Sequence, residues 1–347
     1  MKNILIVLSV LILILSVFLI YKSPKTISYE PPIISENLKP EPKEIKLIFF
    51  GDIMLDRGVK SSVNNNFSED YSVLFGPAKD LINKADIAFL NLEGPISDGG
   101  RKVGSIYSFR FDPKISTVLK ETGFDIVSFA NNHVGDYSSV AFKDTLTHLE
   151  NAGIKYAGSG MNYSDAKTPR EIIIENTKFC FLGFSDVGPD WIKATEATAG
   201  ILLASDPEFE NIIKSGKLGC DILITSFHWG EEYKYFNSRQ ETLAKKAIDS
   251  GADIVIGHHP HVTQDIEIYN GKIIVYSLGN FIFDQYFSPE TLEGMNLSLV
   301  VKDKIITEAS FRKTKQTRKY NIESISEPTN VDISTDQIIK IQNSIRK

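Results

Sequence analysis

Cysteine is scarce in this chain of 347 residues, which contains only Cys180 and Cys220 and no Cys-x-x-Cys pair. Without that spacing, cysteine is not expected to serve as a metal ligand here. Both cysteines lie in apolar, strand-like runs. They are either buried free thiols or a disulfide between neighbouring strands, and the sequence leaves both open.

The chain also lacks an excess of positive charge. It has 38 Lys and Arg against 44 Asp and Glu, a formal net charge of -6. No nucleic-acid partner is expected, because such proteins carry a basic patch that neutralises phosphates. One group of basic residues lies near the C-terminus, and such a run is typical of a solvated tail. Its members are Arg312, Lys313, Lys315, Arg318 and Lys319.

One long apolar run without charge is present, at residues 4–20. As a helix it would be about 26 Å long at ~1.5 Å per residue, enough for a hydrocarbon core of ~30 Å with Tyr21 and Lys22 at the interface. The run is long for a signal peptide, and no small-x-small cleavage pattern follows. We therefore expect an uncleaved membrane anchor over residues 1–22. The proline-rich residues 23–44 predict an extended linker.

From residue 45 onward, apolar runs alternate with amphipathic segments. The runs have the length of strands buried on both faces, and they are residues 46–50, 86–90, 125–130, 179–184, 221–227, 253–256 and 273–277. The predicted helices are residues 78–84, 113–122, 138–151 and 240–250. This alternation predicts an α/β domain with a largely parallel or mixed sheet covered by helices. The domain is expected to span residues 45–313, and residues 314–347 to form a polar C-terminal tail.

Polar side chains follow the predicted strands, at the edge where ligands bind in open α/β sheets. The candidates are Asp52, Glu93, Asn132, His228, His259 and His261. Carboxylate, carboxamide and imidazole groups together suit Mn, Zn or Fe better than Ca or Mg. Each residue alone has an ordinary explanation, as a helix cap, a turn residue or a half-buried histidine. Their occurrence at consecutive strand ends predicts a site for one or two divalent metal ions.

The segments around these residues resemble the CapA family, the poly-γ-glutamate capsule biosynthesis proteins, called PgsA in some systems. In family order across residues 46–285, they are FFGDIMLDRGV, FLNLEGPIS, FRFDP, GFDIVSFANNHVGDYS, AGIKYAGSG, SFHWGEEY, GADIVIGHHPHVTQ and YSLGNFIFDQ. The resemblance implies a calcineurin-like metallophosphoesterase sandwich, in which two mixed β-sheets are flanked by helices, preceded by one N-terminal transmembrane helix. It also implies a single-pass protein of the cell membrane with its domain on the extracytoplasmic side.

The resemblance also implies roles for individual residues. Asp52 corresponds to the first-strand ligand and Glu93 to the bridging carboxylate. His133 corresponds to a general acid or charge stabiliser. The remaining implied ligands are Asn132, His228, His259 and His261.

The sequence departs from the superfamily pattern in the first motif. That motif is Asp-x-His, and this chain has Met54 in place of the histidine. The half-site of Asp52 and His261 is therefore depleted, and Asp56 is the nearest substitute in sequence. Arg110, in the FRFDP segment, is either a clamp for a carboxylate or phosphate or part of a structural ion pair.

Two functions follow from these patterns. The first is a metal-dependent hydrolase that activates water against a phosphoester or a γ-glutamyl amide, with an anionic extracellular polymer such as poly-γ-glutamate as its substrate. The alternative is a non-catalytic component of a capsule synthesis or export complex, which binds the polyanion beside capsule synthase subunits. Met54 and the expected anchor favour the alternative, whereas the ligand set favours the enzyme.

Overall fold

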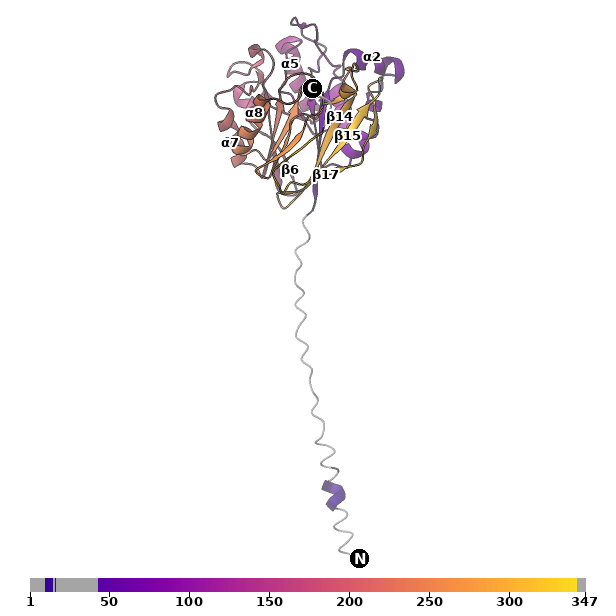
Figure 1. Ribbon diagram of the computed structural model, residues 1–347, viewed down its shortest axis with the longest axis vertical. Helices are drawn as coiled ribbons and strands as arrows, with labels where there is room; N and C mark the ends of the chain where they lie inside the picture. Colours follow the sequence, from indigo (N-terminus) through magenta and orange to yellow (C-terminus); the bar gives the residue numbers. More distant parts are fainter. Residues whose placement is uncertain (1–9, 15, 17–42, 342–347) are drawn as a thin grey trace, which may run out of the picture. The chain divides into compact units, whose positions relative to one another are not determined.

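The computed structural model describes residues 10–14, 16 and 43–341 (Figure 1). Most of the predicted anchor and linker, residues 1–22 and 23–44, lies outside the described residues. Among the helices that are described, none is long and apolar enough to span a membrane.

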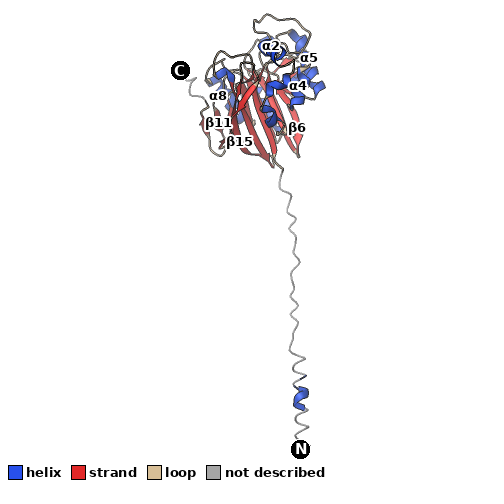
Figure 2. Ribbon diagram, turned by 90° about the vertical axis from the view of Figure 1, so that its right-hand side faces the viewer, coloured by secondary structure: helices blue, strands red, loops and turns tan. Residues whose placement is uncertain are grey.

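Two mixed β-sheets lie face to face in residues 43–341 (Figure 2). The first has the order β16-β15-β14-β1-β2-β3-β4, with β13 paired to β1 and β17 to β15. Its strands are β1 (Ile45–Ile53), β2 (Ile87–Leu92), β3 (Ile126–Ser128), β4 (Lys155–Ala157), β13 (Asn280–Ile282), β14 (Glu293–Lys302), β15 (Ile305–Gln316), β16 (Ile322–Ile325) and β17 (Thr329–Val331).

The second sheet has the order β18-β11-β12-β10-β9-β7-β6. Its strands are β6 (Arg170–Ile174), β7 (Thr177–Ser185), β9 (Ile222–His228), β10 (Ile254–His258), β11 (Ile266–Tyr269), β12 (Lys272–Val275) and β18 (Gln337–Ile339). A small third sheet joins β5 (Ser159–Gly160) to β8 (Gly200–Ile201).

Helices cover the outer faces of both large sheets. Those on the first sheet are α2 (Arg57–Asn66), α3 (Ala78–Ile82), α4 (Ile115–Thr122) and α5 (Ser138–Ala152), with the short 3₁₀ turn η1 (Tyr71–Phe75). Those on the second are α6 (Tyr163–Ala166), α7 (Phe209–Leu218) and α8 (Ser238–Asp249). Two further 3₁₀ turns are η2 (Asp190–Ile192) and η3 (Glu290–Leu292).

The central strand β1 shows how the sequence specifies these layers. Phe49 packs into the core between the two sheets, whereas Phe50 packs into the core beneath the helices. Side chains alternate between the two faces of a strand, so a strand buried on both faces is apolar at both positions. Phe89 on β2 stacks on Phe181 of the facing sheet at 6.1 Å between ring centroids. Burying each such side chain contributes roughly 1.5–3 kcal/mol.

The predicted architecture of two mixed sheets flanked by helices is confirmed. Each predicted strand and helix lies within a few residues of an observed one. Glycine ends two of the helices as expected, because Gly123 after α4 and Gly153 after α5 adopt left-handed backbone conformations at φ of 113° and 73°.

The predicted domain end at residue 313 is wrong for the described part of the C-terminal segment. It falls inside β15, and β16, β17 and β18 follow it, so the folded domain continues to residue 341. Two of the basic residues, Lys313 and Lys315, lie on one exposed face of β15, where their charge resembles that of a solvated tail. The alternating residues Thr314 and Gln316 are buried on the other face.

Cys180 and Cys220 form a disulfide, which resolves the open question of their state. It joins β7 to the turn that follows α7, with 5.9 Å between the Cα atoms. Cys220 lies just before β9 and not within it, so the bond pins a helix end to the sheet instead of linking two strands. The disulfide closes a separation of 40 residues, and restricting the unfolded chain in this way is stabilising.

Candidate metal centre

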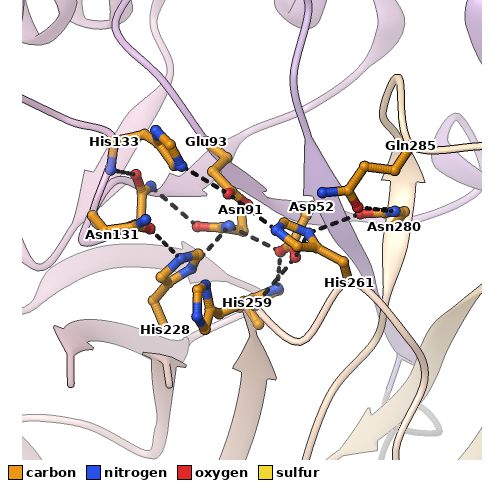
Figure 3. A network of polar contacts seen from close by, with 12 residues as sticks. Asp52, Asn91, Glu93, Asn131, His133, His228, His259, His261, Asn280 and Gln285 are labelled. Carbon is orange, nitrogen blue, oxygen red and sulfur yellow. Dashed lines mark hydrogen bonds and ion pairs between the residues drawn. The ribbon is translucent and has the colours of Figure 1, made fainter. Parts of the chain in front are cut away.

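The candidate site lies where the carboxyl ends of parallel strands from both sheets meet (Figure 3). In the first sheet, Asp52 on β1 is in register with Asn91 on β2 and with Asn280 on β13. In the second sheet, His258 on β10 is in register with His228 on β9. Strand pairing therefore places residues far apart in sequence at neighbouring positions.

Glu93 is at the centre of the site. Its side chain is fully buried, and neither carboxylate oxygen has a hydrogen-bond partner within the described part of the chain. His133 Nε2 lies 3.7 Å from Glu93 Oε1, and His261 Nε2 lies 3.6 Å from the same oxygen. Burial raises the pKa of the Glu93 carboxyl well above its usual range, with His261 opposing and the charges of Asp52 and Glu232 adding to the rise. Such an oxygen pair is costly to bury unless something binds it.

Asp52 is equally buried but is fully hydrogen-bonded. Its Oδ1 accepts from Asn91 Nδ2 at 2.9 Å and from His258 Nδ1 at 3.1 Å. Its Oδ2 accepts from the His259 backbone N–H at 3.1 Å and faces His261 Nδ1 at 3.3 Å. Burial acts to raise the pKa of Asp52, but the hydrogen bonds from His258 and His261 outweigh it and lower the pKa well below its usual range.

The turn His259-Pro260-His261 carries backbone strain. His259 has φ of 96° and His261 has φ of 58°, in the left-handed region that glycine favours. Non-glycine residues with such angles cost energy and are frequent at functional sites. The centroids of the two imidazole rings lie 5.8 Å apart across this turn.

The tautomer of His261 follows from its neighbours. Nδ1 lies 3.0 Å from Asn280 Oδ1 and 3.3 Å from Asp52 Oδ2, and both oxygens are acceptors, so Nδ1 carries a proton. Nε2 is thereby directed at Glu93. Burial acts to lower the pKa of His261, but the Glu93 charge and the Asp52 hydrogen bond raise it to about 9.

His259 and His228 are neutral imidazoles in this environment. Burial, assisted by the charge of His261, lowers the pKa of His259 to about 3. Burial also lowers the pKa of His228 well below its usual range, with His259 adding to the effect. His228 Nε2 lies 2.7 Å from Asn132 Oδ1, and His259 Nδ1 has no partner among residues 43–341. Neutral imidazole is the form that binds metal ions.

His133 is held by a carboxylate that the sequence analysis did not identify. Its Nδ1 lies 2.8 Å from Asp136 Oδ2, and the same oxygen accepts the Phe109 backbone N–H at 2.8 Å. The hydrogen bond fixes the proton on Nδ1 and leaves Nε2 facing Glu93. The NNHVGD segment contains both residues, and their separation of three positions is the signal that could have found Asp136.

The structure brings together all six predicted ligands and His133, but not Arg110. The Arg110 guanidinium donates to the backbone oxygen of Gly99 at 3.0 Å and lies 4.3 Å over the Tyr137 ring. It is held in a structural contact and is not among the residues that line the cleft, so its role as a clamp stays a prediction. Arg57 lines the cleft instead, paired with Asp284 and 4.7 Å from the Phe109 ring centroid.

A cleft of about 590 Å³ opens onto this site. Asn132, His133 and His261 reach it from the buried network. Its remaining lining is aromatic and charged, and consists of Arg57, Ser105, Tyr107, Phe109, Glu232, Tyr233, Phe283, Asp284, Gln285 and Phe287. A reactant in this cleft would therefore lie beside His133, against a polar and aromatic wall.

Several residues of the network were not predicted as site residues. They are Asn91, Asn131, Asp136, Glu232 and Asn280. Asn131 Nδ2 donates to the Leu92 backbone oxygen at 2.8 Å, and its Oδ1 accepts the His133 N–H at 3.1 Å, so it sets the position of the NNH segment. Each lies within a motif that the sequence analysis quoted, but hydrogen-bond roles follow from strand register, which the sequence does not state.

The described region matches known proteins over most of its length. The family described as bacterial capsule synthesis protein PGA_cap matches residues 46–285. The PGA biosynthesis protein CapA of Bacillus subtilis is 32% identical over 268 residues, which cover 76% of this chain and 67% of that protein. The capsule biosynthesis protein CapA of Bacillus anthracis is 36% identical over 254 residues, covering 71% of this chain and 61% of that protein.

Two solved structures were also compared. A hypothetical protein from Thermus thermophilus gives a TM-score of 0.49 at 16% identity, covering 79% of this chain and 100% of that chain. A phosphatase from Mycoplasma pneumoniae gives 0.44 at 16% identity, covering 84% and 94%.

Proposed function

Because the chain belongs to the CapA family of bacterial capsule synthesis proteins, we propose that it is a metal-dependent hydrolase of poly-γ-glutamate biosynthesis or processing, with a calcineurin-like metallophosphoesterase fold. The observation that carries the proposal is Glu93. Its two buried oxygens have no hydrogen-bond partner in the described part of the chain, and two imidazole Nε2 atoms lie 3.6 and 3.7 Å from one of them.

The donor set fits a divalent cation. Asp52, Glu93 and His261 offer ligand atoms within 4.8 Å of one another. Three more donors extend this set, and they are His228, His259 and the Asn132 carboxamide. The ring centroids of His228 and His259 lie 4.7 Å apart. Mixed oxygen and nitrogen donors of this kind suit Mn, Zn or Fe. When bound, one or two such ions would supply Lewis-acid polarisation and lower the pKa of water.

The chain's own residues would then position the reactant and move a proton. His133 lines the cleft and is anchored at Nδ1 by Asp136. A histidine so oriented can give a proton to a leaving group or stabilise its charge. Asp52 contacts the rings of His258 and His261 and accepts the His259 backbone N–H. Its role in this scheme is therefore to orient two imidazoles as well as to balance charge.

The substrate class that we propose is an anionic extracellular polymer such as poly-γ-glutamate, cleaved at an amide or ester bond. Arg57 in the cleft is the cation placed to face a carboxylate, although Asp284 already pairs with it. We further propose that residues 4–20 anchor the protein in the cell membrane in a single pass, with the domain outside and capsule synthase subunits as neighbours. Support for the anchor is the uncharged apolar composition of that run.

A non-catalytic, polymer-binding role is the second candidate, and one observation favours it. Both Asp52 oxygens already accept hydrogen bonds, and Met54 replaces the imidazole that the superfamily has nearby. A metal centre that is weakened at Asp52 could bind a polyanion through a cation without hydrolysing it.

The deciding experiment uses the full chain with Mn²⁺, Zn²⁺ or Fe²⁺ and two substrates, a model phosphoester and poly-γ-glutamate. We expect hydrolysis that the double substitution His259→Ala, His261→Ala abolishes. The matched control is His148→Ala, because His148 lies on α5 and takes no part in the network. Polymer binding without turnover under every metal would favour the second candidate, and equal behaviour of wild type and double variant would refute both.

A further inference from the structure

Glu232, in the loop after β9, lies next to the site although no strand ends at it. Its carboxylate and one ring nitrogen each of His259 and His261 lie within 4.8 Å of one another. The group of Asp52, Glu93 and His261 has the same spacing, so His261 is common to both groups. Glu232 is exposed and lines the cleft, whereas the two imidazoles are buried.

The two positions that sequence offers for the missing imidazole do not supply a ligand. Met54 is fully buried in the core beneath the helices, and its Sδ accepts the Asp56 backbone N–H at 3.2 Å. The Asp56 carboxylate accepts the Arg110 backbone N–H at 2.9 Å. Both side chains are thus committed to local structure on the helix side of β1.

The loop that carries Glu232 is tied to the histidine turn by its next residue. The Tyr233 backbone N–H donates to the Pro260 backbone oxygen at 2.8 Å, and Pro260 stands between the two histidines. Gln285 Nε2 donates to Tyr233 Oη at 2.9 Å. Tyr233 has φ of 61°, a left-handed conformation that non-glycine residues rarely adopt. The strain and the bonds together hold Glu232 over His259 and His261.

Unsatisfied atoms point to a ligand between these groups. His259 Nδ1 is buried without a partner among residues 43–341, and both Glu93 oxygens are in the same condition. His259 is 7% exposed and Glu93 is 0% exposed. Buried polar atoms are normally bonded, and carboxylates and neutral imidazoles share one common ligand class, a divalent cation.

We propose that Glu232 is a metal ligand of this centre and stands in for the imidazole that position 54 lacks. The inference rests on the proposed metal-dependent function and adds a ligand from a loop of the second sheet. A further carboxylate makes the donor set richer in oxygen, which shifts its preference toward Mn²⁺ relative to Zn²⁺. Because Glu232 is at the cleft surface, it is also the ligand that an incoming anionic polymer would meet first.

The test compares Glu232→Gln with Glu231→Gln in the full chain. Glu231 is the exposed neighbour in the same loop and serves as the control for charge. Mn²⁺ binding is measured by the loss of the free-ion electron paramagnetic resonance signal, which requires no turnover. We expect Glu232→Gln to lose one bound Mn²⁺ or to weaken binding at least about tenfold, and Glu231→Gln to bind like wild type. Thermal unfolding in chelator checks that both variants fold as wild type does.

Three results would overturn the inference, and only one of them would also overturn the proposed function. If wild type binds Mn²⁺ and Glu232→Gln binds it with the same number and affinity, Glu232 is not a ligand while the metal-dependent function stands. If wild type binds no divalent cation at all, both fall together. Equal weakening by Glu231→Gln and Glu232→Gln would also overturn it, since the effect would then be general charge at the loop.

Discussion

Asp52 and Glu93 are both buried carboxylates of the first sheet, yet their surroundings differ completely. Asp52 accepts hydrogen bonds at both oxygens, and its pKa is lowered well below the usual range by His258 and His261 against the effect of burial. Glu93 has no hydrogen-bond partner in the described chain, and burial raises its pKa. The difference indicates that Asp52 is built into the fold, whereas Glu93 is kept open for a ligand.

The two sheets supply different kinds of donor atom to the site. Oxygen donors come mainly from the first sheet, and the imidazoles His228, His258, His259 and His261 come from the second. Asp52 bridges the sheets through hydrogen bonds that exist without any ion. Glu93 faces the second sheet across a gap of 3.6 Å to His261 Nε2. The centre therefore depends on how the two sheets pack, and its two carboxylates can be distinguished by substitution.

The largest effect is expected from Asp52→Asn. Removing this charge takes the anionic acceptor away from His258 and leaves His261 with neutral acceptors such as the Asn280 carboxamide oxygen. Breaking a buried pair in this way costs about 3–5 kcal/mol. Denaturant unfolding in chelator measures it. Asp303→Asn, at an exposed turn between β14 and β15, is the control and should be neutral. An Asp52→Asn protein as stable as wild type would contradict the view that Asp52 is built into the fold.

Glu93→Gln should behave in the opposite way. The metal-free protein should be as stable as wild type or more stable by up to ~1 kcal/mol, because an unsatisfied buried carboxylate is replaced by a neutral group. Stabilisation by added Mn²⁺, which for wild type is about 2.7 kcal/mol at a concentration 100 times Kd, should disappear. Thermal unfolding with and without Mn²⁺ gives both quantities. Retained stabilisation by Mn²⁺ would contradict the view of Glu93 as the open carboxylate.

The pH dependence of metal binding should follow from the raised pKa values of His261 and Glu93. The pKa of His261 is raised from 6.5 to about 9, so its proton must leave before the ring can bind an ion, and the raised pKa of Glu93 acts in the same direction. Mn²⁺ affinity should therefore rise with pH up to about 9, roughly tenfold per unit while one proton is displaced. Calorimetry in buffers of different ionisation enthalpy would detect the released proton.

The stability of the metal-free protein should change with pH in the opposite direction to metal affinity. A group whose pKa is raised on folding stabilises below its unfolded pKa, and that stability is lost as the pH rises through the folded value. His261 should therefore stabilise the metal-free fold below pH 6.5 and cease to do so near pH 9. A metal-free unfolding free energy that rises across this window would contradict the assignment.

Much of this could be predicted from sequence because strand ends are marked locally. The predicted ligands each lie within a few residues of the end of an apolar run, and parallel strands bring their carboxyl ends to one edge. These ligands are Asp52, Glu93, Asn132, His228, His259 and His261. The sheet sandwich was implied by the family motifs. These features depend on short sequence segments or on patterns that repeat along the chain.

The errors and omissions concern orientation and pairing instead. Arg110 has the right residue type in a quoted motif, but its guanidinium turns to Gly99 and Tyr137. Asp136 and Glu232 approach the site through a turn and a loop whose paths follow from contacts with Phe109 and Pro260. The basic C-terminal segment is predicted as a tail, because an exposed strand face and a solvated tail carry the same charged residues.

The smallest effect is expected from Asp136→Asn. This substitution changes the support of His133, which faces Glu93, and leaves Glu93 itself intact. The amide can no longer act as a charged acceptor for the proton on His133 Nδ1, so the ring loses its fixed orientation while remaining in place. Turnover should fall by roughly tenfold, the lower end for loss of a supporting hydrogen bond, with Mn²⁺ affinity and the number of bound ions unchanged. Asp144→Asn, on α5 and bonded to Ser97, is the matched control for a lost aspartate. If Asp136→Asn weakens Mn²⁺ binding as strongly as turnover, then His133 takes part in binding the metal ion. In that case His133 is not a group that acts only on the reactant.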